Sequence, residues 1–266
     1  MLRSGEPRLG AVPLRGGVEE LKKALFALAA GIVTLWSFLV PDAPGFASPE
    51  FARIFFWHFP CPIMLTGIIF AAVYFSFRYL RGAGTADRAV WDLRAVAALE
   101  LGLVYAILTM LSGILFSKVQ WGAWWSNDPR QTSFLLAMLF YASYFAIRAA
   151  FPDPEKRAAN SAAYLFATLL PQLFLIFVYP RLPQITSLHP SSTIMKGQLH
   201  GGYLYVILAM LAVVGVLTVW LYRLRVRAGL LLLRESDGTL ETSRRGAGNR
   251  VVARPVSVPA EGGADR

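Results

Sequence analysis

The chain has 266 residues, of which 56% are hydrophobic and 16% are charged, and its formal net charge is +10 at pH 7. This balance excludes an ordinary soluble domain and indicates a polytopic membrane protein. The positive charge does not indicate nucleic-acid binding, because it lies in separate patches between apolar runs. The single cysteine, Cys61, excludes an intramolecular disulfide and a dithiol redox centre within this chain, and a small buried residue is expected there.

Six apolar stretches are each long enough to cross a bilayer, which takes about 20 residues in a helix. They cover residues 21–40, 60–77, 95–116, 133–151, 159–179 and 201–224. Each is apolar on all sides and shows no alternation, so the pattern predicts helices and not a β-barrel. The predicted fold is an all-α integral membrane protein with six transmembrane helices. A membrane domain of residues 21–224 then lies between an N-terminal tail, 1–20, and a basic, disordered tail, 225–266.

The distribution of Lys and Arg predicts the orientation of these spans. Of the 26 basic residues, 21 lie at the two termini or near the second and fourth connections, and only five lie in the first, third and fifth connections. Cytoplasmic loops carry the excess of basic residues, so both termini are expected in the cytoplasm and the odd-numbered connections outside.

Two residues inside the spans stand out. Glu100 lies about five residues into the third span, and an ionisable group there is a functional candidate by default. At this depth it can also reach the headgroups or pair with Arg94, so a structural and a functional role both stay open. Pro171 lies inside the fifth span and predicts a kink.

The third connection is rich in tryptophan and reads WGAWWSNDPRQ from Trp121 to Gln131. A single Trp at a membrane surface is usually an interfacial anchor. Three Trp within five positions, followed by Asn-Asp-Pro-Arg, exceed what anchoring requires. This Trp-rich segment, taken with its flanks as residues 118–133, predicts an exposed aromatic surface for a large, flat, amphipathic ligand.

All three histidines lie on the predicted outer side. His58 lies just before the second span, His189 lies in the fifth connection, and His200 lies at the start of the last span. One histidine at an interface is more often a solvated or hydrogen-bonded residue than a ligand. Several at one face and near one depth favour ligation, because imidazole is a common axial ligand of haem iron.

These residues carry a resemblance to a known family. WGAWWSNDPRQT resembles the W-G-x-W-W-x-x-D-x-R signature of the haem-handling membrane proteins of cytochrome c assembly. The preceding LFSKVQ, the histidines in WHFP and SLHP and the six-span layout are similar to the CcmC family, over roughly residues 21–224. Asn127 stands where that family commonly has Trp, and Pro129-Arg130-Gln131 is nearer the sister family, CcsA.

The resemblance implies a haem b that is bound transiently, with His58 and His189 as its axial ligands. It implies further haem contacts at the Trp-rich segment, namely Trp121, Gly122, Trp124, Trp125, Asp128 and Arg130. The tryptophans and Asp128 would form the surface at the haem edge, and Arg130 suits a propionate because its planar fork matches a carboxylate. His200 lies outside the pattern.

The implied function is delivery of haem, at the periplasmic face of a prokaryotic inner membrane, to a haem chaperone of the CcmE kind. Other maturation subunits, including an ABC-type complex, are implied as partners. No constellation of acids and bases for bond breaking is evident, so a carrier is expected and not an enzyme. One alternative is a b-type cytochrome, which normally places paired histidines inside its spans. The other is a small-molecule permease, for which internal repeats or broken helices are expected and neither is found.

Overall fold

The computed structural model describes residues 15–42, 46–82, 87–189 and 201–248, and every element in these ranges is helical. Within these ranges, six segments are long and apolar enough to cross a membrane. The predicted all-α fold with six spans is therefore confirmed. In chain order the elements are α1 (Arg15–Leu39), η1 (Glu50–Arg53), α2 (Ile54–His58), α3 (Pro60–Arg81), α4 (Arg88–Trp121), α5 (Pro129–Ala150), α6 (Pro154–Leu173), η2 (Phe174–Val178), η3 (Tyr179–Arg181) and α7 (Gly201–Gly248).

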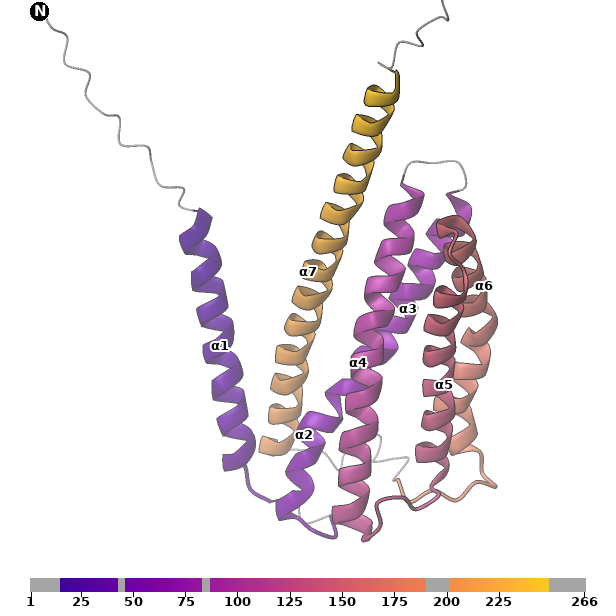
Figure 1. Ribbon diagram of the computed structural model, residues 1–266. Coiled ribbons are helices and arrows are strands. Elements are labelled where there is room, and N and C mark those ends of the chain that lie inside the picture. Colours follow the sequence, from indigo (N-terminus) through magenta and orange to yellow (C-terminus); the bar gives the residue numbers. More distant parts are fainter. Residues whose placement is uncertain (1–14, 43–45, 83–86, 190–200, 249–266) are drawn as a thin grey trace, which may run out of the picture.

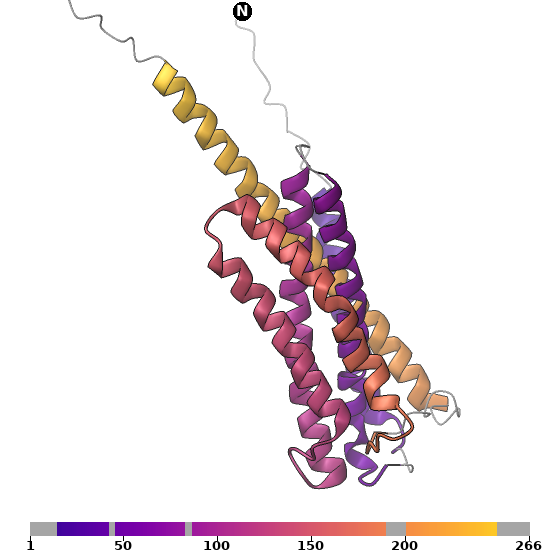
Figure 2. The ribbon, with the colours of Figure 1, turned by 90° about the vertical axis from the view of Figure 1, so that its right-hand side faces the viewer.

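Helices α3 to α6 form the main bundle, α7 runs along α4, and α1 lies outermost against α7 (Figures 1 and 2). The core contains large buried side chains such as Leu65, Leu99 and Tyr144. Gly102 of α4 permits close packing on α3, because a Cβ there would lie 3.1 Å from Cγ2 of Ile68. Small residues at such crossings let the helices of a membrane bundle approach closely.

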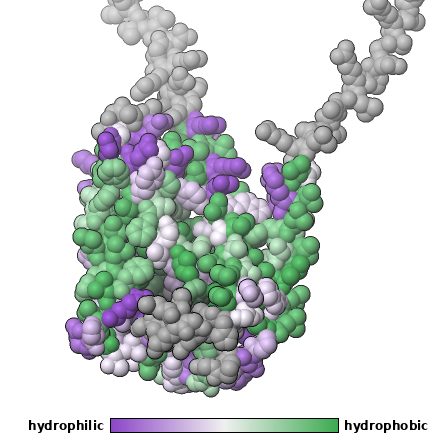
Figure 3. All heavy atoms as spheres, turned by 180° about the vertical axis from the view of Figure 1, so that it is seen from behind, coloured by the Kyte–Doolittle hydropathy of each residue, from purple (hydrophilic) through white to green (hydrophobic). Residues whose placement is uncertain are grey.

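The bundle has two chemically distinct ends. The start of α1, the last turns of α7, the end of α3, the start of α4 and the α5–α6 connection lie at one end, called here the terminal end (Figure 1). The connection from α4 to α5 lies at the opposite end, called here the tryptophan end. On the face shown in Figure 3, hydrophobic side chains form a band between two more polar ends. Successive connections thus lie at opposite ends of the bundle, as the sequence predicted. Which end faces the cytoplasm stays a prediction.

Two helices extend beyond their predicted spans. Helix α1 begins at Arg15, where Glu19 and Lys22 form an i,i+3 ion pair of 3.0 Å. Helix α7 continues to Gly248, although the sequence predicted a disordered tail from residue 225. The length of an apolar stretch indicates which residues can lie in the bilayer core. It does not indicate where the helix ends. Leu, Arg and Ala, which make up eight of the ten residues from 225 to 234, are strong helix formers in water as well.

The second span begins earlier than expected, at Glu50, and includes His58 as the last residue of α2. The prediction that His58 lies in a connection before the span is therefore wrong. Pro60 and Pro62 had indicated a break in the helix before the second span. Proline is tolerated in the first turn of a helix, so these two residues only separate α2 from α3 and do not form a loop.

Other expectations within the spans are resolved by packing. Glu100 forms a two-point ion pair with Arg225 of α7, at 2.6 and 2.9 Å, and does not pair with Arg94.

The α-helical pattern of α6 ends two residues after Pro171 and gives way to the π-helix η2, an irregularity that often accompanies kinks. Cys61 is buried as expected, and its thiol donates to the carbonyl of Trp57 at 3.2 Å.

The orientation of the two ends can be tested with topology reporters. Fusions after Arg81 and after Pro154 are expected to report cytoplasm, and fusions after Ser126 and Gln184 the outer side, because the basic residues gather at the terminal end. Activity of paired phosphatase and fluorescent-protein fusions measures this. A cytoplasmic signal at Ser126 contradicts an outward-facing Trp-rich segment.

Candidate functional site

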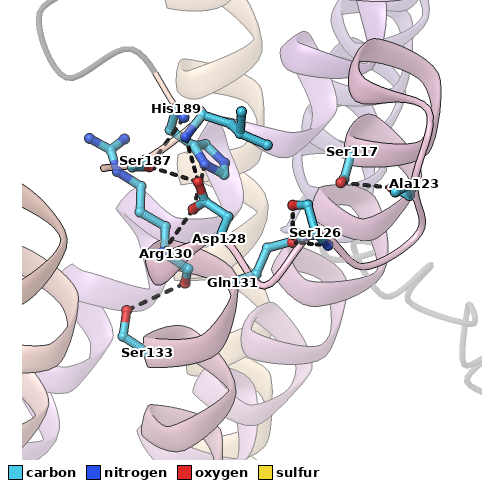
Figure 4. A network of polar contacts seen from close by, with 10 residues as sticks. Ser117, Ala123, Ser126, Asp128, Arg130, Gln131, Ser133, Ser187 and His189 are labelled. Carbon is cyan, nitrogen blue, oxygen red and sulfur yellow. Dashed lines mark hydrogen bonds and ion pairs between the residues drawn. The ribbon is translucent and has the colours of Figure 1, made fainter. Parts of the chain in front are cut away.

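The Trp-rich segment begins with a tight helix end. Helix α4 stops at Trp121, and Gly122 adopts a left-handed conformation with φ +80°, where only glycine is unstrained. The N–H of Gly122 donates to the carbonyl of Lys118 at 3.1 Å. The hydroxyl of Ser117 donates to the carbonyl of Ala123 at 2.9 Å, which folds the connection back over the last turn of α4 (Figure 4).

Two glutamines fix the segment on either side. The amide of Gln120 exchanges hydrogen bonds of 3.0 and 2.9 Å with the backbone of Ser48, which ties the first connection to the end of α4. The carbonyl oxygen of Gln131 accepts from both the N–H and the hydroxyl of Ser126, at 3.2 and 2.9 Å (Figure 4). The turn between α4 and α5 is therefore held by its own polar side chains.

Asn127 has a structural role in the turn between α4 and α5. Its φ is +53°, a left-handed value that asparagine tolerates better than other residues with a side chain. Its side-chain oxygen accepts a 2.9 Å hydrogen bond from the indole N–H of Trp125. Asn127 thus turns the chain and orients one of the three tryptophans.

Asp128 is the hub of the site. Its side chain is fully buried, and it caps α5 by accepting from the N–H of Arg130 at 2.8 Å. Its other oxygen accepts from the hydroxyl of Ser187 at 2.9 Å and from the N–H of Leu188 at 2.6 Å. Nδ1 of His189 lies 3.1 Å from the first oxygen (Figure 4). One carboxylate therefore joins the start of α5 to the segment that carries His189.

The charge states in this hub follow from its contacts. Burial raises the pKa of Asp128, but the donors from Arg130, Leu188, His189 and Ser187 outweigh it, so the pKa lies below its usual range. Burial lowers the pKa of His189, and the attraction of Asp128 only partly offsets this effect. At neutral pH the carboxylate is therefore charged and the imidazole is neutral.

His58 faces α4 from α2. Its Nδ1 lies 2.9 Å from the hydroxyl of Ser112, which itself donates to the carbonyl of Leu108 at 2.5 Å. Gly113 makes room for the imidazole, because a Cβ there would lie only 3.3 Å from Cε1 of His58. A small polar residue followed by glycine therefore forms the seat of this histidine on α4.

A chain of aromatic rings connects the two histidines. The centroids of His58 and Phe116 are 6.4 Å apart, those of Phe116 and Trp121 are 5.8 Å apart, and those of Trp121 and His189 are 4.7 Å apart. Ser112, beside His58, lies nine residues before Trp121, or about 13 Å along the helix. His58 is therefore deeper in the bundle than His189, and the expectation of a common depth is not met.

The structure divides the predicted contact residues into two groups. Trp124 and Trp125 are 57% and 36% exposed, and Gly122 is exposed beside them. Trp121 is half-buried against His189. Asp128 was expected on the same exposed surface, but its side chain is buried because it accepts four hydrogen bonds there. The side chain of Arg130 extends from α5 toward the segment of Ser187 (Figure 4). His200 lies outside the described residues.

Sequence analysis missed the residues that support the histidines, namely Ser112, Gly113, Phe116 and Ser187. A Ser-Gly pair inside an apolar span is a weak signal of close helix packing, and it stands in the sequence at residues 112 and 113. The partner that it accommodates is not visible in the sequence. The serine two residues before His189 likewise gives no indication that it shares a carboxylate with that histidine.

A family model described as CcmC, Heme exporter protein C, matches residues 16–241 of the chain. The chain belongs to this family. Curated relatives with the name "Heme exporter protein C" include that of Paracoccus denitrificans, 32% identical over 47% of this chain and 49% of the relative. That of Bradyrhizobium diazoefficiens is 30% identical over 60% of this chain and 63% of the relative. That of Escherichia coli K12 is 28% identical over 61% and 63%. These alignments span about half to under two thirds of the relatives' length.

The neutral state of His189 predicts a pH-dependent stability in this CcmC-family chain. In the unfolded chain the imidazole takes up a proton near its ordinary pKa of 6.5, whereas in the folded chain it does so only at lower pH. The unfolded state therefore binds more protons as the pH falls below about 6.5, and the folded state loses stability. Thermal unfolding in detergent between about pH 7 and about pH 5 measures this. His189→Gln is expected to flatten the slope, and an unchanged slope contradicts the assignment.

Proposed function

We propose that this chain is a carrier that holds haem at the outer face of the membrane, between His58 and His189, and delivers it to a haem chaperone of the CcmE kind. The names of the relatives support haem as the cargo. The observation that carries the proposal is that two histidines from different elements are each held through Nδ1 and are linked by one chain of aromatic rings.

The partners of the two imidazoles favour the tautomer that binds iron. The single proton of the Ser112 hydroxyl is used in its bond to Leu108, so the hydroxyl accepts from Nδ1–H of His58. The carboxylate of Asp128 can only accept, so Nδ1 of His189 is also the protonated nitrogen. In the described part of the chain neither Nε2 has a hydrogen-bond partner. Both Nε2 atoms therefore keep a lone pair for an axial position.

The two ligands are unequal, and this inequality suits a carrier. A carboxylate behind an imidazole raises its basicity as a ligand, as in the histidines that hold metals with a carboxylate behind them. His189 has Asp128 behind it, whereas His58 has only the neutral hydroxyl of Ser112. His189 is then the stronger axial ligand, and the bond to His58 breaks first when haem leaves.

The Trp-rich segment completes the haem contacts. Trp121 lies against His189 and packs on the porphyrin near the iron, while Trp124 and Trp125 stand at the exposed edge, where a chaperone meets the ring. Because Gly122 has no side chain, the backbone at this position can lie close to the exposed edge of the haem. Arg130 pairs with a propionate through its planar fork. Asp128 acts behind His189 and does not touch the haem edge.

A b-type cytochrome normally places paired histidines inside its spans, and His58 does lie inside the second span. His189 still lies in a connection, beside exposed tryptophans. A haem spanning from a helix to a surface loop is open on one side, which suits release better than electron transfer through a buried centre. The absorption spectrum of the purified protein separates the two functions. Exchangeable, substoichiometric haem supports a carrier, and tight stoichiometric haem supports a cytochrome.

His58→Ala and His189→Ala are each expected to abolish the six-coordinate haem spectrum, since two ligands fill the two axial positions. His200→Ala is expected to leave it unchanged. Visible absorption of haem-loaded protein in detergent measures this. Added imidazole is expected to restore the spectra of the first two variants, which shows that ligation is lost and not folding. A loss in His200→Ala without a loss in His189→Ala contradicts the ligand assignment.

The tryptophans are expected to contribute to haem retention beyond anchoring. Trp121→Ala, Trp124→Ala and Trp125→Ala should each weaken haem retention by about 1–3 kcal/mol, as the loss of a packed aromatic face does. Haem transfer to apomyoglobin gives the retention, and delivery to the chaperone is followed beside it.

Trp36→Ala is the matched control, because Trp36 of α1 is 38% exposed but lies outside the segment. If the three variants insert, retain haem and deliver it like the parent, the Trp-rich segment is only an interfacial anchor.

A further inference from the structure

A cavity lies near the terminal end, remote from the histidines. It has a volume of about 300 Å³ and is formed between α3, α4 and α7. Its lining residues are Phe75, Arg94, Tyr222, Arg223, Val226 and Arg227. It is called here the α7 pocket. Tyr222 and Val226, and likewise Arg223 and Arg227, are four residues apart, so α7 contributes two adjacent rows of one helix face.

Two contacts between the antiparallel helices α4 and α7 fix the walls of this pocket. The ion pair of Glu100 with Arg225 lies toward the centre of the bundle, at 2.6 and 2.9 Å. One turn farther along α7, Gly229 lies so close to Leu93 that an added Cβ would collide with that side chain. Arg94 follows Leu93 directly, so the contact that brings the helices together also positions one of the pocket's arginines.

The α7 pocket carries an excess of positive charge. Arg94, Arg223 and Arg227 line it, and in the part of the chain that the structure describes none of the three forms an ion pair. The nearby carboxylate of Glu100 is already occupied by Arg225. Glu19 of α1 attracts Arg227 over a longer range. Three guanidinium groups on one small cavity are an arrangement that favours an anion.

One of the residues that line the same pocket, Tyr222, carries a hydroxyl without a partner. The Tyr222 hydroxyl is shielded from solvent and has no hydrogen-bond partner. Buried hydroxyls in native proteins nearly always have one. The ring itself is fixed, because it stacks on Phe75 with the centroids 6.0 Å apart and the planes 3° apart. The Arg94 guanidinium is likewise held, 4.7 Å from the centre of the Trp91 ring.

We propose that the α7 pocket binds the phosphate of an anionic phospholipid headgroup. The guanidinium groups of Arg94, Arg223 and Arg227 contact the phosphate oxygens, and the hydroxyl of Tyr222 donates to one of them. Phe75 and Val226 pack against the glycerol and the first acyl carbons. The proposal is independent of haem binding, and it leaves the histidine site unchanged.

The position of the pocket favours a lipid over a soluble anion. Its α7 residues lie within the segment Gly201–Glu235 that is long and apolar enough to span a membrane, and Phe75 lies within the second span. Arginines appear there just where the apolar stretch of residues 201–224 ends, at the depth of a headgroup. Basic pockets between transmembrane helices at such depths recognise anionic lipid headgroups.

Native mass spectrometry of the full chain in detergent, titrated with phosphatidylglycerol or phosphatidylcholine, tests the proposal. Phosphatidylglycerol is expected to remain bound where phosphatidylcholine does not. Tyr222→Phe keeps the stacked ring and removes only the hydroxyl, so it is expected to weaken phosphatidylglycerol binding by about tenfold, the effect of losing a hydrogen bond to a charged group. Arg94→Gln is expected to weaken it at least as much.

Arg234→Gln is the matched control, because it removes the same charge from an exposed position farther along α7. It is expected to bind phosphatidylglycerol like the parent. Equal retention of the two lipids, or equal losses in Arg234→Gln and Arg94→Gln, overturns the proposal in favour of unspecific surface attraction. Displacement of phosphatidylglycerol by millimolar inorganic phosphate overturns it in favour of a free-anion site.

Discussion

The hydrogen bonds of the buried Asp128 carboxylate are the interaction on which the tryptophan end depends. One side chain caps α5, accepts from the backbone and hydroxyl of the segment before His189, and contacts the imidazole itself. A buried charge is costly unless it is fully hydrogen-bonded, so these contacts must form together. The helix start, the loop and the histidine are therefore positioned as one unit. The rest of the site is built around that unit.

The bundle provides the second half of the site from a different depth. His58 is seated on α4 by Ser112 and Gly113, and the rings of Phe116 and Trp121 form a chain of contacts from it to His189. One of the two candidate ligands thus belongs to the helical bundle and the other to a surface segment. In the proposed function this difference separates a stable binding position from an opening through which haem leaves.

The fold was predictable from the sequence because bilayer thickness fixes how long an apolar run must be. The ends of helices were not, because a helix such as α7 continues through Arg-rich sequence that lipid does not favour. The Trp-rich segment and the histidines were chosen as candidates from their residue types, and their role stays a prediction. Three features depend on which helix faces meet in the bundle, and a single sequence does not contain that information. They are the burial of Asp128, the contact of His58 with Ser112 and the ion pair of Glu100 with Arg225.

The most direct measurement is the haem affinity and visible spectrum of the Asp128→Asn variant. Asparagine is also a good helix cap, so α5 is expected to start normally, while the charge behind His189 is lost. The result predicted is a haem affinity lower by about 10- to 100-fold, as for other partners of metal-binding histidines, with a shift from six- to five-coordinate haem. A folded, membrane-inserted variant with the parent's affinity and spectrum would contradict the central role of this carboxylate.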